Sequence, residues 1–234
     1  LSTYLTFEPV GYAEFGLPAG HWRQVIQKGN AYTVTYFDAL WRPRMTRTFD
    51  ASNEAATRSV VVKAYDAAGN LAFDSYPQRD IASVDVNWPG RRMGYDALRR
   101  NTLTIADTEL PQPAVTFTAY LPAFQVQKTS PRGFVTTETL WALDNPDQAL
   151  AARIQAPEGV DVVITRDAFG KPRSISRGGV TRSYVYAADQ RLCKTVEPET
   201  GATVQDYDAA GNIAWRAPGQ NLPGPDCDRG AVMA

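Results

Sequence analysis

A seven-residue segment that recurs along the chain constrains its fold more than any other feature. Residues 207–213 read Tyr-Asp-Ala-Ala-Gly-Asn-Ile, and residues 65–71 differ from them only in the last residue, which is Leu71. A looser copy occupies residues 166–171. Asp is favoured at the first position of a type I turn, and Gly is favoured where the chain then needs a positive φ. The segment therefore predicts a short hairpin loop between two antiparallel strands.

The residues that define this turn signature are Tyr65, Asp66, Gly69, Asn70, Asp167, Gly170, Tyr207, Asp208, Gly211 and Asn212. Three further segments, 38–42, 96–100 and 187–192, occupy turn positions but lack the Gly, the Asp or both. We expect wider or irregular loops there, because the residues that favour the tight turn are missing.

The spacing of the turns predicts a repeat architecture. The late turns begin at 167, 187 and 208, and the early ones at 38, 66 and 96. Periods of 20–50 residues are typical of proteins in which each unit contacts its neighbours. The leucine pattern of leucine-rich repeats is absent. A β-propeller remains open on length, but its blade signatures are missing. An all-β fold with one continuous antiparallel sheet of hairpins needs fewer assumptions.

The Tyr-Asp-x-x-Gly-Asn-Leu element at this spacing resembles the RHS/YD-repeat family of bacteria, whose animal relatives are the teneurins. The resemblance covers most of residues 31–216, and residues 157–172 share its pattern. It implies a long sheet that curls into part of a hollow shell. In the family such a shell can enclose a C-terminal toxin or act as a scaffold on secreted and cell-surface proteins. The family's self-cleaving core is not recognisable, since Asn145-Pro146 and Pro225-Asp226 do not match it.

Further expectations about function follow from the resemblance. This chain would be a structural or encapsulating segment, secreted or on the bacterial cell surface. Its partners would be the rest of a larger RHS polypeptide or an enclosed toxin domain. No leader segment is visible, and the start of the chain suggests a piece of a longer protein. The alternative is a module that binds carbohydrate or protein through exposed aromatic residues, and a hydrolase is a distant third.

The chain divides by composition into three parts. Residues 1–30 are predicted to be an irregular, aromatic-rich segment, 31–216 the repeat sheet with a connection at 143–159, and 217–234 a Pro- and Gly-rich tail. At most one short helix is predicted, near 146–154. A cap residue, an early Pro and Ala-rich content favour it. The alternative is a single helical turn inside a long connection.

Composition argues against several kinds of chemistry. A formal net charge of −1 argues against binding to nucleic acid, and no apolar run is long enough to insert into a membrane. His21 is the only histidine, so a hydrolytic triad or a Cys-His pair with Cys193 would have to use it. We expect no enzyme activity, no cofactor and no metal, and we interpret Asp208 as a turn cap.

Two structural questions stay open at the level of sequence. Cys193 and Cys227 are the only cysteines and either form a disulfide or remain two free thiols. Seven tyrosines recur at strand ends and are expected to stack across strands as a ladder: Tyr32, Tyr36, Tyr65, Tyr95, Tyr184, Tyr186 and Tyr207. An incomplete sheet exposes its edges. We therefore expect an edge-to-edge dimer, or an edge that residues 1–30 cover.

Overall fold

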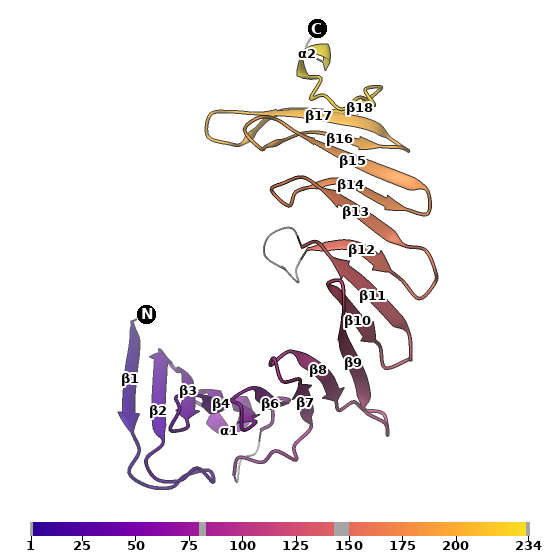
Figure 1. Cartoon of the computed structure of the whole chain (residues 1–234). Helices are drawn as coiled ribbons and strands as arrows, with labels where there is room; N and C mark the ends of the chain where they lie inside the picture. The colour runs from indigo at the N-terminus through magenta and orange to yellow at the C-terminus, as the bar shows by residue number, and fades with distance from the viewer. Residues whose placement is uncertain (1, 80–82, 143–149, 233–234) are drawn as a thin grey trace. The chain divides into compact units, whose positions relative to one another are not determined.

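The structure is a computed structural model that describes residues 2–79, 83–142 and 150–232. It is an all-β fold in which 18 antiparallel strands form one open sheet, with two four-residue helices (Figure 1). This confirms the predicted fold class. The strands pair in sequence order, so each hairpin is followed along the sheet by the next. The chain divides into two compact units, Leu1–Thr118 and Ala119–Ala234, and β9 runs across the division.

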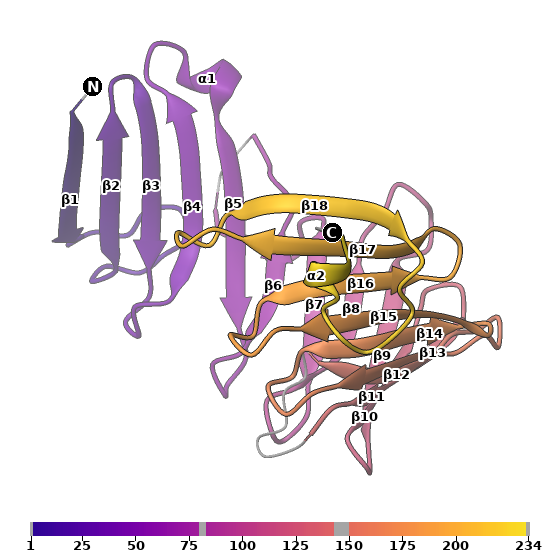
Figure 2. The ribbon, with the colours of Figure 1, turned by 90° about the horizontal axis from the view of Figure 1, so that it is seen from above.

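The connections of the first unit are short except after Pro9 and Ser75, and its elements follow one another along the chain. They are β1 (Thr3–Pro9), β2 (Trp22–Lys28), β3 (Ala31–Phe37), β4 (Pro43–Asp50), α1 (Glu54–Thr57), β5 (Ser59–Tyr65), β6 (Leu71–Ser75), β7 (Gly90–Tyr95) and β8 (Asn101–Ala106). Strand β1 stands at one end of this row (Figure 2).

The second unit repeats the same hairpin arrangement. After β9 (Ala114–Leu121) come β10 (Gln125–Thr129), β11 (Val135–Leu140), β12 (Ala151–Gln155), β13 (Val162–Arg166), β14 (Pro172–Arg177), β15 (Val180–Tyr186), β16 (Leu192–Glu197), β17 (Gly201–Tyr207), β18 (Ile213–Gln220) and α2 (Arg229–Val232). Helix α2 packs on β17.

Every Tyr-Asp hairpin carries a β-bulge at the same place. In β5–β6, Ala64 pairs with Phe73 and Tyr65 pairs with Leu71, so Ala72 is an extra residue. The hairpins β3–β4, β7–β8, β13–β14, β15–β16 and β17–β18 show the same shift just after their turns. A bulge bends its strand and increases the local right-handed twist. Each hairpin is therefore twisted at an equivalent position.

The turns that lack glycine are not wider or irregular, so that prediction was wrong. The amide of Asp38 donates to the Arg42 carbonyl at 3.0 Å, and Asp66 donates to Asn70 in the same way at 2.9 Å. Trp41, Arg99 and Gln190 take the glycine position with φ of 61°, 61° and 67°. A left-handed conformation costs a non-glycine residue about 1–2 kcal/mol. Strand pairing on both sides of the turn imposes it here.

Residues 1–30 are not irregular, because β1 and β2 pair over seven residues and β2 continues into the sheet through β3. The apolar residues of this segment do not alternate regularly along the sequence. The segment forms regular strands only because β1 and β2 pair with each other and with β3. These residues therefore contribute two strands to the sheet instead of covering an edge of it. At the other end, the predicted tail contributes the last part of β18 and helix α2.

The predicted helix near 146–154 was wrong where the structure describes it. Residues 146–149 lie outside the described residues, but Ala151–Gln155 is strand β12. Glu138 pairs with Ile154 across β11–β12, and this pairing outweighs the weak helical preference of an Ala-rich sequence. The two helices present, α1 and α2, lie elsewhere, and α1 begins after Asn53, whose side chain accepts from the Ala56 amide.

The core of the first unit lies on one face of β3–β6. Its buried residues are Leu17, Val34, Tyr36, Met45, Val60, Val62 and Phe73. Phe15, Val84 and Trp88 pack against them from two connecting segments. The sheet is therefore covered on one face in this region, and the opposite face of β1–β3 presents Phe7 and Trp22.

The backbone conformation of the turns generates a testable prediction. Gly211 has φ of 88°, and a Cβ added there would meet nothing within 4 Å. We expect Gly211→Ala to lower the free energy of unfolding by about 1 kcal/mol through backbone strain alone. Urea denaturation would measure it. The matched variant Arg99→Gly removes a side chain from the same turn position and should be neutral or stabilising. A clear loss of stability there would contradict the left-handed assignment.

Candidate functional surface

The six Tyr-Asp turns form a feature that we call the Tyr-Asp rim. It comprises residues 38–42, 66–70 and 96–100 in the first unit and 167–171, 187–191 and 208–212 in the second. In each unit its turns close the hairpins at the same end. In five of the six turns the first residue is an aspartate, and it acts as the cap of the turn.

The Asp66 carboxylate shows how the cap works. Its Oδ1 accepts from the Asn70 amide at 2.8 Å, and its Oδ2 accepts from Asn70 Nδ2 at 2.9 Å. Asp208 holds Asn212 through the same two atoms, at 2.9 and 3.2 Å. The signature residues Asp and Asn are thus a bonded pair across the turn. Asp167 accepts from the Lys171 amide at 3.0 Å.

Where Asn is missing, arginine takes its place. Asp38 Oδ2 accepts from Arg42 Nε at 2.8 Å, and Asp96 Oδ2 accepts from Arg100 Nε at 2.8 Å. In the turn at 187–191 the first residue is alanine, and the Asp189 carboxylate binds the amide and Nε of Arg191 instead. Each of these turns therefore keeps a bond between a carboxylate and the fifth residue of the turn, even where the residue types differ.

These bonds stabilise the charged carboxylates. The Asn70 side chain and amide hold the pKa of Asp66 below its ordinary value. The amide and side chain of Arg100 lower the pKa of Asp96, and those of Asn212 lower the pKa of Asp208. An ionised carboxylate accepts stronger hydrogen bonds than a neutral one. The turn caps are therefore strongest when ionised.

The tyrosine that precedes the aspartate bonds to the preceding hairpin. The Tyr65 hydroxyl donates to the Pro43 carbonyl at 3.0 Å, and the Tyr95 hydroxyl donates to the Leu71 carbonyl at 2.8 Å. In each case the acceptor is the first strand residue after the previous turn. We call this contact the tyrosine latch.

The second unit contains the same latch. Tyr186 donates to the Pro172 carbonyl at 3.1 Å, and Tyr207 donates to the Leu192 carbonyl at 2.9 Å. Arg166 stands where a tyrosine would be, and its Nε and Nη2 donate to the Ala151 carbonyl at 3.2 and 3.0 Å. Ala151 is again the first residue of the preceding even-numbered strand. An arginine can thus perform the same function.

A cation from the preceding turn covers the latch ring in three places. The Arg42 guanidinium lies 4.6 Å from the centre of the Tyr65 ring. Lys171 lies over Tyr186 at 5.2 Å, and Arg191 lies over Tyr207 at 5.1 Å. Burial raises the pKa of the Tyr65 and Tyr186 hydroxyls, which keeps them protonated as donors.

The prediction that the recurrent tyrosines stack on one another across strands was therefore wrong. The latch tyrosines bond to backbone carbonyls and stack under cations instead of stacking on one another. Tyr32 stacks on Phe49 with ring centres 5.3 Å apart, and Tyr36 packs in the core beside Phe15. The hydroxyl partner is a backbone atom 14–24 residues away in sequence, so no residue pattern marks it.

A separate aromatic cluster ties β1 to its neighbours. The ring centres of Phe7 and Trp22 are 5.1 Å apart, and Trp22 stacks on Trp41 at 4.8 Å. Trp41 also contacts Phe7 at 5.1 Å. The cluster therefore links β1, β2 and the first Tyr-Asp turn, and the left-handed strain at Trp41 is offset by this stacking.

His21 and Cys193 do not form a catalytic pair. His21 is buried in the first unit, where Nδ1 lies 2.8 Å from the Pro18 carbonyl and Nε2 lies 3.1 Å from Glu14. Cys193 belongs to the second unit and its sulfur is bonded to Cys227.

Among the described residues, no group of three or more His, Cys, Asp or Glu side chains is placed to hold a metal ion. No described helix is long and apolar enough to cross a membrane.

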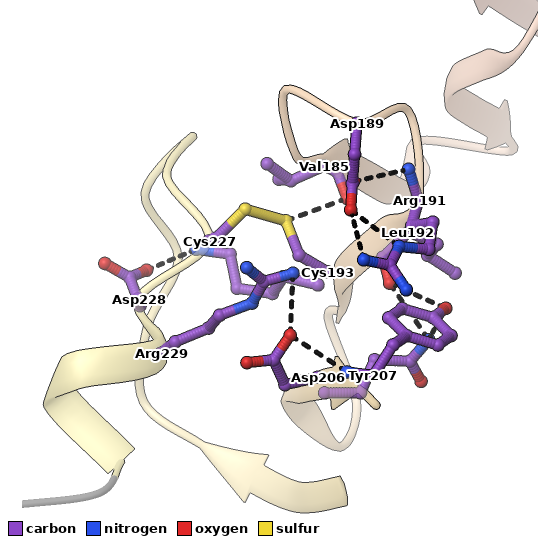
Figure 3. The surroundings of a disulfide bond; sticks show 12 residues. Val185, Asp189, Arg191, Leu192, Cys193, Asp206, Tyr207, Cys227, Asp228 and Arg229 are labelled. Atoms are coloured by element: carbon purple, nitrogen blue, oxygen red, sulfur yellow. Dashed lines mark hydrogen bonds and ion pairs between the residues drawn. A yellow bond between two sulfur atoms is a disulfide. The ribbon is translucent and has the colours of Figure 1, made fainter. Parts of the chain in front are cut away.

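The disulfide fixes the C-terminal segment over β16 and β17 (Figure 3). Cys193 is the bulge residue of β16, and its Cα lies 5.3 Å from that of Cys227. Beside it, Lys194 is 0% exposed and donates to the Gly224 carbonyl at 2.7 Å and to Asp228. Arg229 pairs with Asp206 at 3.1 Å. A buried ammonium needs such partners, so this segment is an integral part of the second unit.

A hollow of about 360 Å³ lies beside the first Tyr-Asp turn. The loop 17–21 and residues 38–40 line it, together with Arg42 and Arg44. Asp38 and Arg42 are already bonded to each other, and Arg44 Nε donates to the Lys63 carbonyl at 3.0 Å. These polar groups serve the fold, so we assign no ligand to the hollow.

No protein-family model matches the chain, and no curated protein matches it. Among solved structures it is similar to the crystal structure of TcdB2-TccC3-TEV, with 12% sequence identity and a TM-score of 0.23. The similarity covers 85% of this chain and 17% of that chain. This chain therefore spans less than a fifth of that protein, and so low a score carries no argument about function.

The tyrosine latch leads to a mutational prediction. We expect Tyr65→Phe to lower the free energy of unfolding by about 1 kcal/mol, because the Pro43 carbonyl loses its donor and the ring stays in place. The control Tyr32→Phe removes a hydroxyl from a ring that stacks on Phe49 and should change stability less. Urea denaturation would compare the two. Equal effects would contradict the latch.

The turn caps predict a dependence of stability on pH. A carboxylate whose pKa is lower in the folded state stabilises the fold fully above its unfolded pKa, and this stability is lost as the pH falls through the folded pKa. Stability should therefore fall as the pH decreases from about 5 to about 2. Replacing Asp66, Asp96 and Asp208 together by Asn should flatten this decline. The control Asp226→Asn, which changes no turn cap, should leave it unchanged, and thermal unfolding at several pH values would measure both.

Proposed function

We propose that this chain is a structural segment of an RHS/YD-repeat protein and forms part of the wall of a shell or scaffold. The observation that carries the proposal is the tyrosine latch, which joins a hairpin to the one before it at four places among the described residues. The contact from Tyr65 to Pro43 in the first unit and the contact from Tyr207 to Leu192 in the second are equivalent. A contact that repeats between neighbours lets a sheet lengthen by adding hairpins.

The geometry of each hairpin supports a wall that curls. The bulge after every Tyr-Asp turn adds twist at the turn end of each hairpin. Repeated at the same end, such a local bend accumulates from hairpin to hairpin. The fixed length of the turns keeps the strands in register while this happens.

The disulfide supports a location outside the reducing cytoplasm. Disulfides persist in secreted and surface proteins and are rare in reducing compartments. Cys193–Cys227 joins residues 34 positions apart and closes the C-terminal segment onto the sheet. We therefore propose that the protein is secreted or lies on the bacterial surface, with a further part of the same polypeptide or an enclosed toxin domain as its partner. This role requires no catalysis by the chain.

A protection assay on the longer polypeptide that contains this segment would test the proposal. We expect a domain that follows the repeats to resist a protease that cleaves the same domain when it is expressed alone. Replacing Tyr65, Tyr95, Tyr186 and Tyr207 by Phe should weaken the wall and increase cleavage of the enclosed domain at least about tenfold, the ratio that corresponds to 1.4 kcal/mol.

The control for this assay is Tyr32→Phe, which leaves all four latches intact and should leave protection unchanged. Equal cleavage of the enclosed and the free domain would show that the repeats enclose nothing. This result would overturn the proposal that the chain forms part of a shell, even if the sheet itself were stable.

A further inference from the structure

We propose that residues 221–232 form a strap whose attachment depends on redox state. Reduction of the Cys193–Cys227 disulfide by a dithiol releases the strap from β16 and β17 and uncovers Lys194. The strap follows β18 and includes α2. The inference concerns this segment and the strands beneath it, and it does not require the shell function.

The strap has few attachments besides the disulfide. None of its residues is buried. Among the described residues, its polar contacts with the strands involve side chains: Lys194 donates to Gly224 and Asp228, and Arg229 pairs with Asp206. A segment with little buried apolar surface and few backbone bonds to its neighbours opens locally at low cost. The covalent bond is therefore its main restraint.

The ion pair of Lys194 is a weak second restraint. Lys194 is 0% exposed, and both acceptors of its Nζ belong to the strap. Removing an ammonium from water costs free energy that its buried partners do little more than offset. When the strap leaves, water reaches the ammonium and replaces both partners. The burial of Lys194 is thus a consequence of the closed strap and a marker of it.

The backbone of the strap favours release. Asp228 has φ of 53°, a left-handed conformation that is unfavourable for a residue with a Cβ. It is restrained on both sides, because Cys227 before it is bonded to β16 and Arg229 after it pairs with Asp206 (Figure 3). Breaking the disulfide removes the covalent restraint, so Asp228 can adopt an ordinary conformation.

The two sulfurs differ in access, which sets the course of the reduction. Cys193 is 0% exposed, whereas Cys227 is only half-buried. A thiolate of the dithiol attacks the Cys227 sulfur and forms a mixed disulfide, and Cys193 leaves as a thiolate that takes up a proton. The second thiolate of the reductant then attacks the mixed disulfide. It forms the reductant's own disulfide and frees Cys227, so two electrons pass to the protein.

The sheet can accommodate the reduced cysteine. Cys193 Sγ lies 3.2 Å from the Val185 carbonyl oxygen, so the hydrogen of the reduced thiol has an acceptor in place. Val185 pairs with Lys194 across β15–β16, and this pairing does not involve the disulfide. We therefore expect reduction to release the strap and to leave β15–β17 folded.

Release of the strap changes the surface of β16 and β17. Cys193 is a bulge residue, and a bulge redirects side chains, so Cys193 and Lys194 both contact the strap although they are consecutive. Lys194 pairs with Val204, and Val196 pairs with Ala202. Val204 is 0% and Ala202 is 1% exposed. Opening therefore exposes an ammonium group that lies among apolar side chains.

Acetylation of lysines would test the release. We expect Lys194 to react at least about tenfold faster after treatment with dithiothreitol and removal of the reductant, because the strap has lost its cross-link. Mass spectrometry would measure the rate at each lysine. Lys128, whose side chain is 51% exposed, should react equally in both states. Lys171, which lies over Tyr186, reports on the sheet itself and should also be unchanged.

The same measurement can contradict the proposal in three ways. A Lys194 that stays slow after reduction would show that the other contacts hold the strap. Equal acceleration at Lys194 and Lys171 would show that reduction unfolds the sheet instead of releasing one segment. Reoxidation should restore the slow reaction of Lys194, and a failure to do so would show that the change is not a reversible switch.

Trypsin cleavage after Arg229 provides an independent test on a matched variant. Cleavage should be slow in the oxidised chain and at least about tenfold faster after reduction, because a bond must leave the folded surface to enter a protease. Cys227→Ser should be cleaved fast with or without dithiothreitol. Cleavage after Arg177, whose side chain is 59% exposed, should be the same in all samples. Slow cleavage after Arg229 in Cys227→Ser would overturn the proposal.

Discussion

The hydrogen bond between a tyrosine hydroxyl and the carbonyl that follows the preceding turn organises this sheet. It depends on the aspartate cap, because the cap fixes the loop and thereby places the first strand residue after it. Tyr65 can reach the Pro43 carbonyl only if the turn at 38–42 is closed. The dipeptide Tyr-Asp thus combines two functions. Asp shapes its own hairpin, and Tyr binds the previous one.

The geometry persists where the residue types change, which shows that strand pairing imposes it. Arg166 donates to the Ala151 carbonyl where tyrosines do so elsewhere. Arg99 holds the left-handed position that glycine occupies at Gly69, and the loop closes with the same hydrogen bonds. The strain of one residue is small compared with the ladder of bonds on both sides of the turn. A repeat that has lost its signature in sequence can therefore still be a regular repeat in structure.

The sequence predicted what is local and missed what depends on distant partners. The Asp-x-x-Gly pattern predicted the hairpins and hence the all-β class, because a type I turn is specified by a few adjacent residues. The strand over Ala151–Gln155 could not be recognised, since its alanines favour a helix and only β11 makes them a strand. The tyrosine latch could not be predicted from the sequence either. Its acceptor is a main-chain carbonyl, which no residue type distinguishes, so the recurrent tyrosines suggested stacking instead.

The contacts around the last hairpins differ from those of the repeat itself. The disulfide at Cys227 and the buried Lys194 bring the C-terminal segment back over β16 and β17. The repeat joins neighbouring hairpins through one kind of bond, from a tyrosine hydroxyl to a backbone carbonyl. These contacts instead join a segment without regular strands to the face of the sheet, through a covalent bond and a buried ammonium. Because a buried ammonium needs its partners, they hold this segment on the sheet independently of the latch.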